Sequence, residues 1–127
     1  MRSTSLVRSL AILILVTALS PLIAQERRVA LVIGNGNYAF APRLANPAND
    51  AQDMALKLES LGFSVTKLVD GGLGDLLKAQ SDFAEAAKGA GLRLFYYAGH
   101  GIQAEGENWL LPVDADLKAF ADGGFMA

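Results

Sequence analysis

The sequence predicts a doubly wound α/β domain with a mainly parallel sheet and helices on both faces. Short runs of β-branched, aliphatic and aromatic residues alternate with longer segments in which apolar residues recur at helical spacing. The resulting order is strand, helix, strand, helix, strand, which favours parallel strands joined by right-handed crossovers. In such sheets, ligands bind in the loops at the carboxyl ends of the strands.

The first 24 residues are expected to be a secretory signal rather than part of the fold. Arg2 and Arg8 precede an almost wholly apolar run over residues 10–24, and residues 25–28 are polar. This run is shorter than the ~20 residues that cross a bilayer. We predict a signal peptide at residues 1–24, cleaved after Ala24, and a periplasmic or secreted protein. An uncleaved N-terminal anchor and a buried core helix are the alternatives.

Residues 25–127 are enough for one small domain. A net charge of -2 and a pI near 5.3 give no electrostatic footprint for nucleic acid. The chain contains no cysteine, which excludes a disulfide framework, a thiolate nucleophile and a thiolate metal ligand within it. Its single histidine excludes a zinc site built from several histidines.

The first strand is predicted over residues 28–34, a continuous apolar run ended by a Gly/Asn cluster. A loop rich in Asn, Pro and Gly covers residues 35–47. The first helix is predicted over residues 50–61, with Asn49 as its N-cap and Gln52 at its third position.

The second strand is predicted over residues 63–69, where β-rich residues precede the Gly71–Gly72 pair. Apolar spacing then predicts a second helix over residues 75–88, and the third strand is expected over residues 92–98. Residues 109–113 are predicted to form a short edge strand or hairpin arm, since Pro112 argues against a central strand.

His100 is the most informative residue for function, because it directly follows the third strand. Gly99 and Gly101 flank it, so the backbone there can approach a ligand closely. An imidazole titrates near neutral pH and suits proton transfer to or from a nucleophile or leaving group. The amide of Gly101 could donate to a developing oxyanion.

Four segments occur in an order and spacing that resemble those of bacterial caspase-like domains of the metacaspase or orthocaspase type, in peptidase family C14. They are VALVIGNGNY (29–38), LANPANDAQDMALKLESLGF (44–63), FYYAGHG (95–101) and NWLLPVDA (108–115). The resemblance covers nearly all of residues 27–115 and implies a caspase-like sheet and a cysteine-type endopeptidase acting on peptides or proteins.

The resemblance also implies roles for three residues. His100 matches the histidine of the catalytic dyad, and Gly101 matches the glycine whose amide helps to form the oxyanion hole. Asp50 lies where metacaspase-type members place an acidic residue of the pocket for a basic side chain before the scissile bond. An acid in the first turn of a helix is also favoured by the helix dipole, so Asp50 has a purely structural alternative.

The sequence departs from the family in lacking the nucleophile. Caspases carry their cysteine roughly 50 residues downstream of the histidine, whereas this chain stops at Ala127. We therefore expect the N-terminal, histidine-bearing part of the domain, truncated after the third core strand and a short hairpin. This part would be inactive alone and would associate with a C-terminal partner segment.

Two other functions are weighed against the endopeptidase. The absence of a nucleophile favours a catalytically inert caspase-like binding module. The segment GNGNYA (34–39), with Asp53 downstream, matches a dinucleotide-binding motif. In that fold, however, the helix opens inside the glycine motif, whereas Pro42, Asn46 and Pro47 delay it here.

No cofactor is expected. Asp114 and Asp116 could bind calcium, which some metacaspases use, but two carboxylates fall short of the roughly six to eight oxygens that calcium requires. The aromatic side chains of Phe95, Tyr96 and Tyr97 are expected to pack alternately on the two helix layers, and Trp109 to cover the loop behind His100.

Export can be tested directly with a fusion of residues 1–30 to a reporter that is active only outside the cytoplasm. The charged start and the apolar run should carry the reporter across the membrane, and reporter activity measures this. A reporter that remains cytoplasmic would contradict the predicted signal peptide.

Overall fold

The computed structural model describes residues 26–121, so the predicted signal peptide lies outside the described residues. Three parallel strands form the central sheet, with β1 (Arg28–Gly34) between β2 (Phe63–Val69) and β3 (Leu92–Ala98). All three strands have the predicted bounds. Continuous runs of apolar and β-branched residues, each ended by glycine or a polar turn, explain why these bounds could be predicted.

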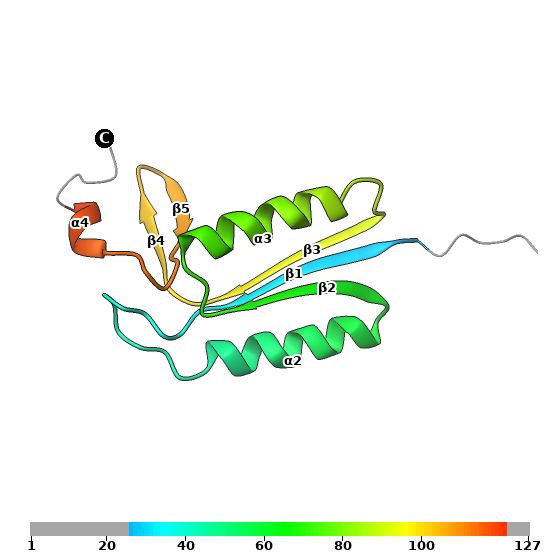
Figure 1. Ribbon diagram of the computed structural model, residues 1–127, viewed down its shortest axis with the longest axis horizontal. Helices are drawn as coiled ribbons and strands as arrows, with labels where there is room; N and C mark the ends of the chain where they lie inside the picture. Colours follow the sequence, from blue (N-terminus) through cyan, green and yellow to red (C-terminus); the bar gives the residue numbers. More distant parts are fainter. Residues whose placement is uncertain (1–25, 122–127) are drawn as a thin grey trace, which may run out of the picture.

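The sheet lies between two helices, α2 (Pro47–Ser60) on one face and α3 (Leu73–Ala86) on the other, as Figure 1 shows. This confirms the α/β class with a mainly parallel sheet. The backbone of α2 lies close to all three strands, whereas the backbone of α3 lies close to β1 and β2 only. The α3 face of β3 is therefore left partly open.

Both helices begin before their predicted first residues. The helix α2 starts at Pro47 with Asn46 as its N-cap, so the prediction that Asn49 caps it is wrong. Proline suits the first turn of a helix because its missing N–H would have no partner there. The helix α3 starts at Leu73, and the Asp75 carboxylate accepts a hydrogen bond from the Gly72 amide at 3.1 Å.

The core consists of two apolar clusters, one on each face of β1, because successive strand residues point to opposite faces. Toward α2 the buried residues are Ala30, Val32, Ala51, Ala55 and Leu58, with Tyr96 packed against them. Toward α3 they are Leu31, Ile33 and Ala79, with Tyr97 packed against them. The expected alternation of Tyr96 and Tyr97 between the layers is confirmed.

A hairpin follows the sheet and packs beside its carboxyl edge (Figure 1). Its strands are β4 (Gly101–Ala104) and β5 (Glu107–Leu110), joined by Glu105 and Gly106 with φ of 54° and 83°. Two successive residues at positive φ define the tight turn that hairpins favour. The predicted strand over residues 109–113 is thus displaced toward the N-terminus, since Pro112 cannot donate to a ladder. A short helix, α4 (Leu117–Ala121), follows.

Two aromatic side chains lie beside α3. Trp109 lies in β5 opposite Ile102. Together with Phe95, Leu73, Leu77 and Leu110 it lines an open apolar groove of about 530 Å³ beside α3. Phe95 lies on the α3 face of β3 and is 50% exposed, since it borders this open groove. No helix within residues 26–121 is long and apolar enough to cross a membrane.

Candidate functional site

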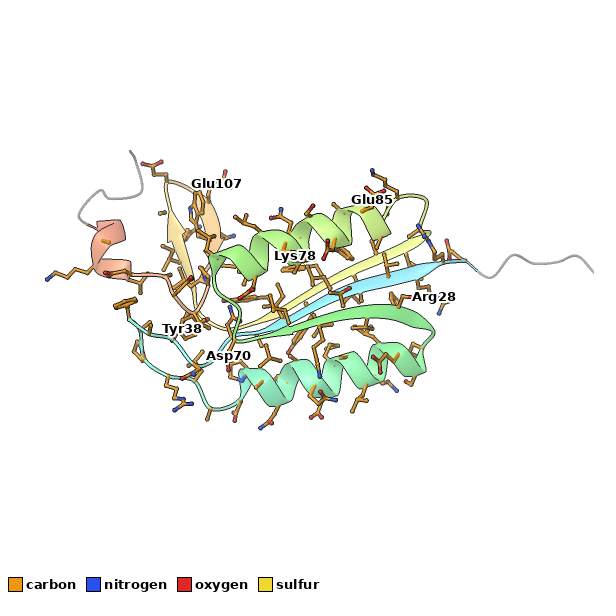
Figure 2. The ribbon with its side chains drawn as sticks, in the orientation of Figure 1. Arg28, Tyr38, Asp70, Lys78, Glu85 and Glu107 are labelled. Atoms are coloured by element: carbon orange, nitrogen blue, oxygen red, sulfur yellow. The ribbon has the colours of Figure 1, made fainter. Side chains whose placement is uncertain are left out.

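Polar residues gather where the three parallel strands end. Asn35 follows β1, Asp70 follows β2, and His100 follows β3 after a single glycine. Figure 2 shows Tyr38 and Asp70 at this edge and Arg28 at the opposite end of the sheet. The parallel topology therefore brings together residues that are distant in sequence, as expected for a site at the carboxyl ends of the strands.

The side chain of Asn35 is fully buried and joins three loops. Its carbonyl oxygen accepts a hydrogen bond from the Gly71 amide at 3.0 Å. Its amide nitrogen donates to the Leu111 carbonyl at 3.2 Å and lies 3.4 Å from the Gly71 carbonyl oxygen. The end of β1 is thereby tied to the loop after β2 and to the segment after β5.

Asp70 holds the loop that follows β1. One oxygen of its carboxylate accepts hydrogen bonds from the amides of Gly36 and Asn37 at 2.8 and 2.9 Å. Its φ of 51° lies in the left-handed region, which Asp tolerates better than most residues. Asp70 was not among the predicted site residues, although an Asp between a strand and a Gly–Gly pair is a recognisable turn signal.

The loop held by Asp70 supplies the partner of the His100 side chain. The Nε2 atom of His100 lies 2.7 Å from the carbonyl oxygen of Pro42. A carbonyl oxygen can only accept, so Nε2 carries the proton, and in the neutral ring the lone pair is on Nδ1. The loop thus selects the tautomer of His100 and leaves Nδ1 available as a base.

Two phenol groups lie against His100. The ring of Tyr38 is 4.7 Å from the imidazole, centroid to centroid, and its hydroxyl is 3.1 Å from that of Tyr97. Burial raises the pKa of the Tyr97 hydroxyl above its ordinary value, and the hydrogen bond with Tyr38 raises it further. Tyr97 therefore stays protonated under all ordinary conditions. The sequence predicted only a packing role for Tyr97 and no role for its hydroxyl.

The amide of Gly101 points away from the hairpin. Leu111 N donates to His100 O at 3.0 Å, so His100 and Leu111 form a hydrogen-bonded pair. Pairs along an antiparallel ladder alternate between hydrogen-bonded and non-hydrogen-bonded. Only one of the two bonds is made at His100 and Leu111, because His100 N donates to the Tyr38 hydroxyl. The pair Ala104 with Glu107, which closes the two-residue turn, is also hydrogen-bonded by this alternation, and Gly101 with Leu110 is non-hydrogen-bonded. The Gly101 N–H is left facing outward, beside the imidazole-bearing residue, where it could donate to another molecule.

Comparison with known proteins decides the family. The model of the caspase domain, peptidase family C14, matches residues 27–126. The chain belongs to the caspase domain family. It is 36% identical over 88 residues to mucosa-associated lymphoid tissue lymphoma translocation protein 1 from Homo sapiens, and 35% identical over 88 residues to its homolog from Mus musculus. Each match covers 69% of this chain and 11% of the relative.

The third predicted site residue of this caspase domain, Asp50, lies in the first turn of α2 and is exposed. Its backbone amide donates to the Asn46 carbonyl at 2.9 Å. In the described part of the chain, the hydrogen bonds around His100 and Gly101 do not include the Asp50 side chain. His100 and Gly101 are adjacent, whereas Asp50 stands apart on the helix that follows the Pro42 loop.

The two carboxylates considered for calcium have local backbone partners. Asp114 accepts a hydrogen bond from the Leu73 amide at 2.9 Å, at the start of α3. Asp116 accepts hydrogen bonds from the amides of Lys118 and Ala119 at 3.0 and 3.2 Å, at the start of α4. Within residues 26–121, no group of three or more acidic or histidine side chains is placed to hold a metal ion.

Replacing Asn35 should weaken the loop framework. The variant Asn35→Ala leaves the buried Gly71 N–H without its partner, and we expect the free energy of unfolding to fall by about 2–3 kcal/mol. Urea denaturation followed by circular dichroism measures this. The exposed neighbour Asn37, changed to Ala, is the matched control and should cost less than about 0.5 kcal/mol. Equal losses in the two variants would contradict the role of the buried amide.

Proposed function

We propose that this caspase domain supplies the histidine side of a cysteine endopeptidase site. One observation supports this above all: His100 is held at the carboxyl end of β3, and its Nε2–H donates a hydrogen bond to the Pro42 carbonyl. The free Nδ1 lone pair is then the base that thiol activation requires. The Gly101 amide, directed away from the hairpin, is the adjacent donor for an oxyanion.

In the proposed reaction, the nucleophile is a cysteine that comes from outside residues 1–127, because this chain has none. Nδ1 of His100 takes the thiol proton, and the thiolate adds to the peptide carbonyl carbon. The Gly101 N–H stabilises the oxyanion. The C–N bond then breaks as His100 gives its proton to the leaving amine, which leaves a thioester. Water attacks the thioester with His100 as the base, the C–S bond breaks, and the acid product and the thiol are released.

A basic side chain before the scissile bond is the proposed specificity. Asp50 supports this because it is an exposed carboxylate on the helix that the Pro42 loop leads into. A carboxylate can accept two hydrogen bonds from a guanidinium or pair with an ammonium group. The metacaspase-type resemblance points to the same residue.

A catalytically inert caspase-like binding module is the second candidate. The absence of cysteine from all 127 residues favours it. Such a module would keep the loop framework around Asn35 and His100 while binding a peptide or protein without cleaving it. For either function we propose a periplasmic or secreted location, based on the apolar run that follows Arg2 and Arg8.

Catalysis can be tested with a completed domain, in which the chain is fused to the cysteine-bearing part of a related caspase domain. The 127-residue chain alone should show no peptidase activity, and the completed domain should cleave peptides. The variant His100→Ala should lower kcat by at least about 100-fold, since it removes the base, while Gln103→Ala on the nearby strand β4 should not. A folded completed domain without activity would favour the binding module, whereas a domain that His100→Ala leaves fully active would contradict the role of His100 as the base.

Specificity can be tested in the same completed domain. Asp50→Ala should lower kcat/KM for substrates with Arg or Lys by about 10- to 100-fold, the value of one hydrogen-bonded charge pair. Asp53→Ala, on the same helix and also exposed, is the matched control. If both variants cleave basic substrates at the wild-type rate, Asp50 has only the helix-terminus role, which contributes about 0.3–1 kcal/mol to stability.

A further inference from the structure

The backbone of His100 is bound on both sides by tyrosine hydroxyls. His100 N donates to the Tyr38 hydroxyl at 2.7 Å, and the Tyr97 hydroxyl donates to His100 O at 2.7 Å. The two hydroxyls are 3.1 Å apart. Tyr38 is distant in sequence from the other two, 62 positions from His100 and 59 from Tyr97, whereas Tyr97 precedes His100 by three.

The donor and the acceptor in each of these hydrogen bonds follow from the protons available. The His100 N–H can only donate, so Tyr38 accepts there. The proton of Tyr38 can go to the Tyr97 hydroxyl at 3.1 Å or to the Leu111 carbonyl at 3.4 Å, and the shorter distance favours Tyr97. The His100 carbonyl can only accept, so Tyr97 must donate to it. The bonds form a closed ring, from His100 N–H to Tyr38, to Tyr97 and back to the His100 carbonyl. In such a ring each bond polarises and strengthens the next.

The Tyr97 proton has a second acceptor, the Leu111 carbonyl at 2.9 Å. The shorter distance to His100 O, 2.7 Å, favours the closed ring. Because burial keeps Tyr97 protonated, its donor function is not lost by titration. Leu111 also donates its own amide to His100 O at 3.0 Å, so both residues hold the same carbonyl.

Gly99 makes this arrangement sterically possible. A Cβ atom at this position would lie 2.6 Å from the hydroxyl oxygens of both Tyr38 and Tyr97. Real Cβ atoms essentially never approach other atoms so closely, so any side chain there would displace the hydroxyls. The absence of a side chain at Gly99 therefore allows both hydroxyls to reach the His100 backbone.

We propose that Tyr38 and Tyr97 are a positioning pair that aims the His100 imidazole at the Pro42 carbonyl and so selects its tautomer. The ring of hydrogen bonds fixes the His100 peptide groups, and the face of Tyr38, tilted by 49° against the imidazole, limits its rotation. Only two side-chain torsions then separate the fixed backbone from Nε2. This inference rests on the proposed proton-transfer role of His100.

Because His100 is the chain's single histidine, its imidazole can be observed without interference. We would label the full 127-residue chain with 15N-histidine and record the ring nitrogen signals at about pH 9, where a free imidazole is uncharged. The wild type should show one tautomer, with the proton on Nε2 in slow exchange. Tyr38→Phe and Tyr97→Phe should exchange this proton about five- to ten-fold faster, the factor expected for the loss of one hydrogen bond, and should populate both tautomers.

Tyr96→Phe is the matched control, because Tyr96 lies on the opposite face of β3, against the α2 cluster. It should leave both the tautomer and the exchange rate at wild-type values. Amide exchange at the buried residue Val32 shows whether a variant retains the core, and if one Phe variant fails to fold, the other carries the same readout. If a folded Tyr38→Phe or Tyr97→Phe variant matches Tyr96→Phe in tautomer and exchange, the positioning role is wrong. These signals require no turnover, so this result would leave the proposed peptidase function to its separate test.

Discussion

The buried amide of Asn35 is the interaction on which the rest of the site depends. Loops usually run over the surface, where water satisfies their backbone groups. Here three loops meet at the carboxyl end of the sheet. The Asn35 side chain makes the hydrogen bonds that water would otherwise make with the Gly71 amide and the Leu111 carbonyl. The Gly71 amide would otherwise be buried without this partner, at a cost of about 1–3 kcal/mol, whereas the Leu111 carbonyl also lies 2.9 Å from the Tyr97 hydroxyl. A residue with both a donor and an acceptor at the end of β1 is what this junction requires.

Two sets of hydrogen bonds connect these loops to His100 and hold it in place. Leu111, held by Asn35, donates its amide to His100 O, which fixes the start of the hairpin. The loop after β1, held by Asp70, carries the Pro42 carbonyl to Nε2. Both sets begin at the ends of parallel strands, so the geometry of His100 follows from the sheet topology rather than from its sequence neighbours alone.

The sequence predicts the three strands, the helices and the position of His100, because these depend on local apolar pattern and on glycine spacing. Helix starts are harder to predict, since Asn46 and Asn49 are both acceptable caps, although Pro47 at the first helical position favours Asn46. Asp70, Pro42 and the tyrosine hydroxyls could not be predicted. The roles of Asp70, Pro42 and the Tyr38 hydroxyl depend on contacts between residues 33–62 positions apart. Tyr97 bonds to His100 only three positions away, but no local pattern encodes that its hydroxyl meets this carbonyl.

Every contact that orients His100 comes from within the described residues: the Pro42 carbonyl, the two tyrosines and Leu111. None of them requires a cysteine. The proposed base can therefore be arranged before a nucleophile is present, which would lower the cost of ordering the site when one arrives. An inert binding module could keep the same histidine loop for the same reason. The proposed endopeptidase needs an ordered His100, but this order does not distinguish it from the proposed binding module, whereas the source of the thiol does.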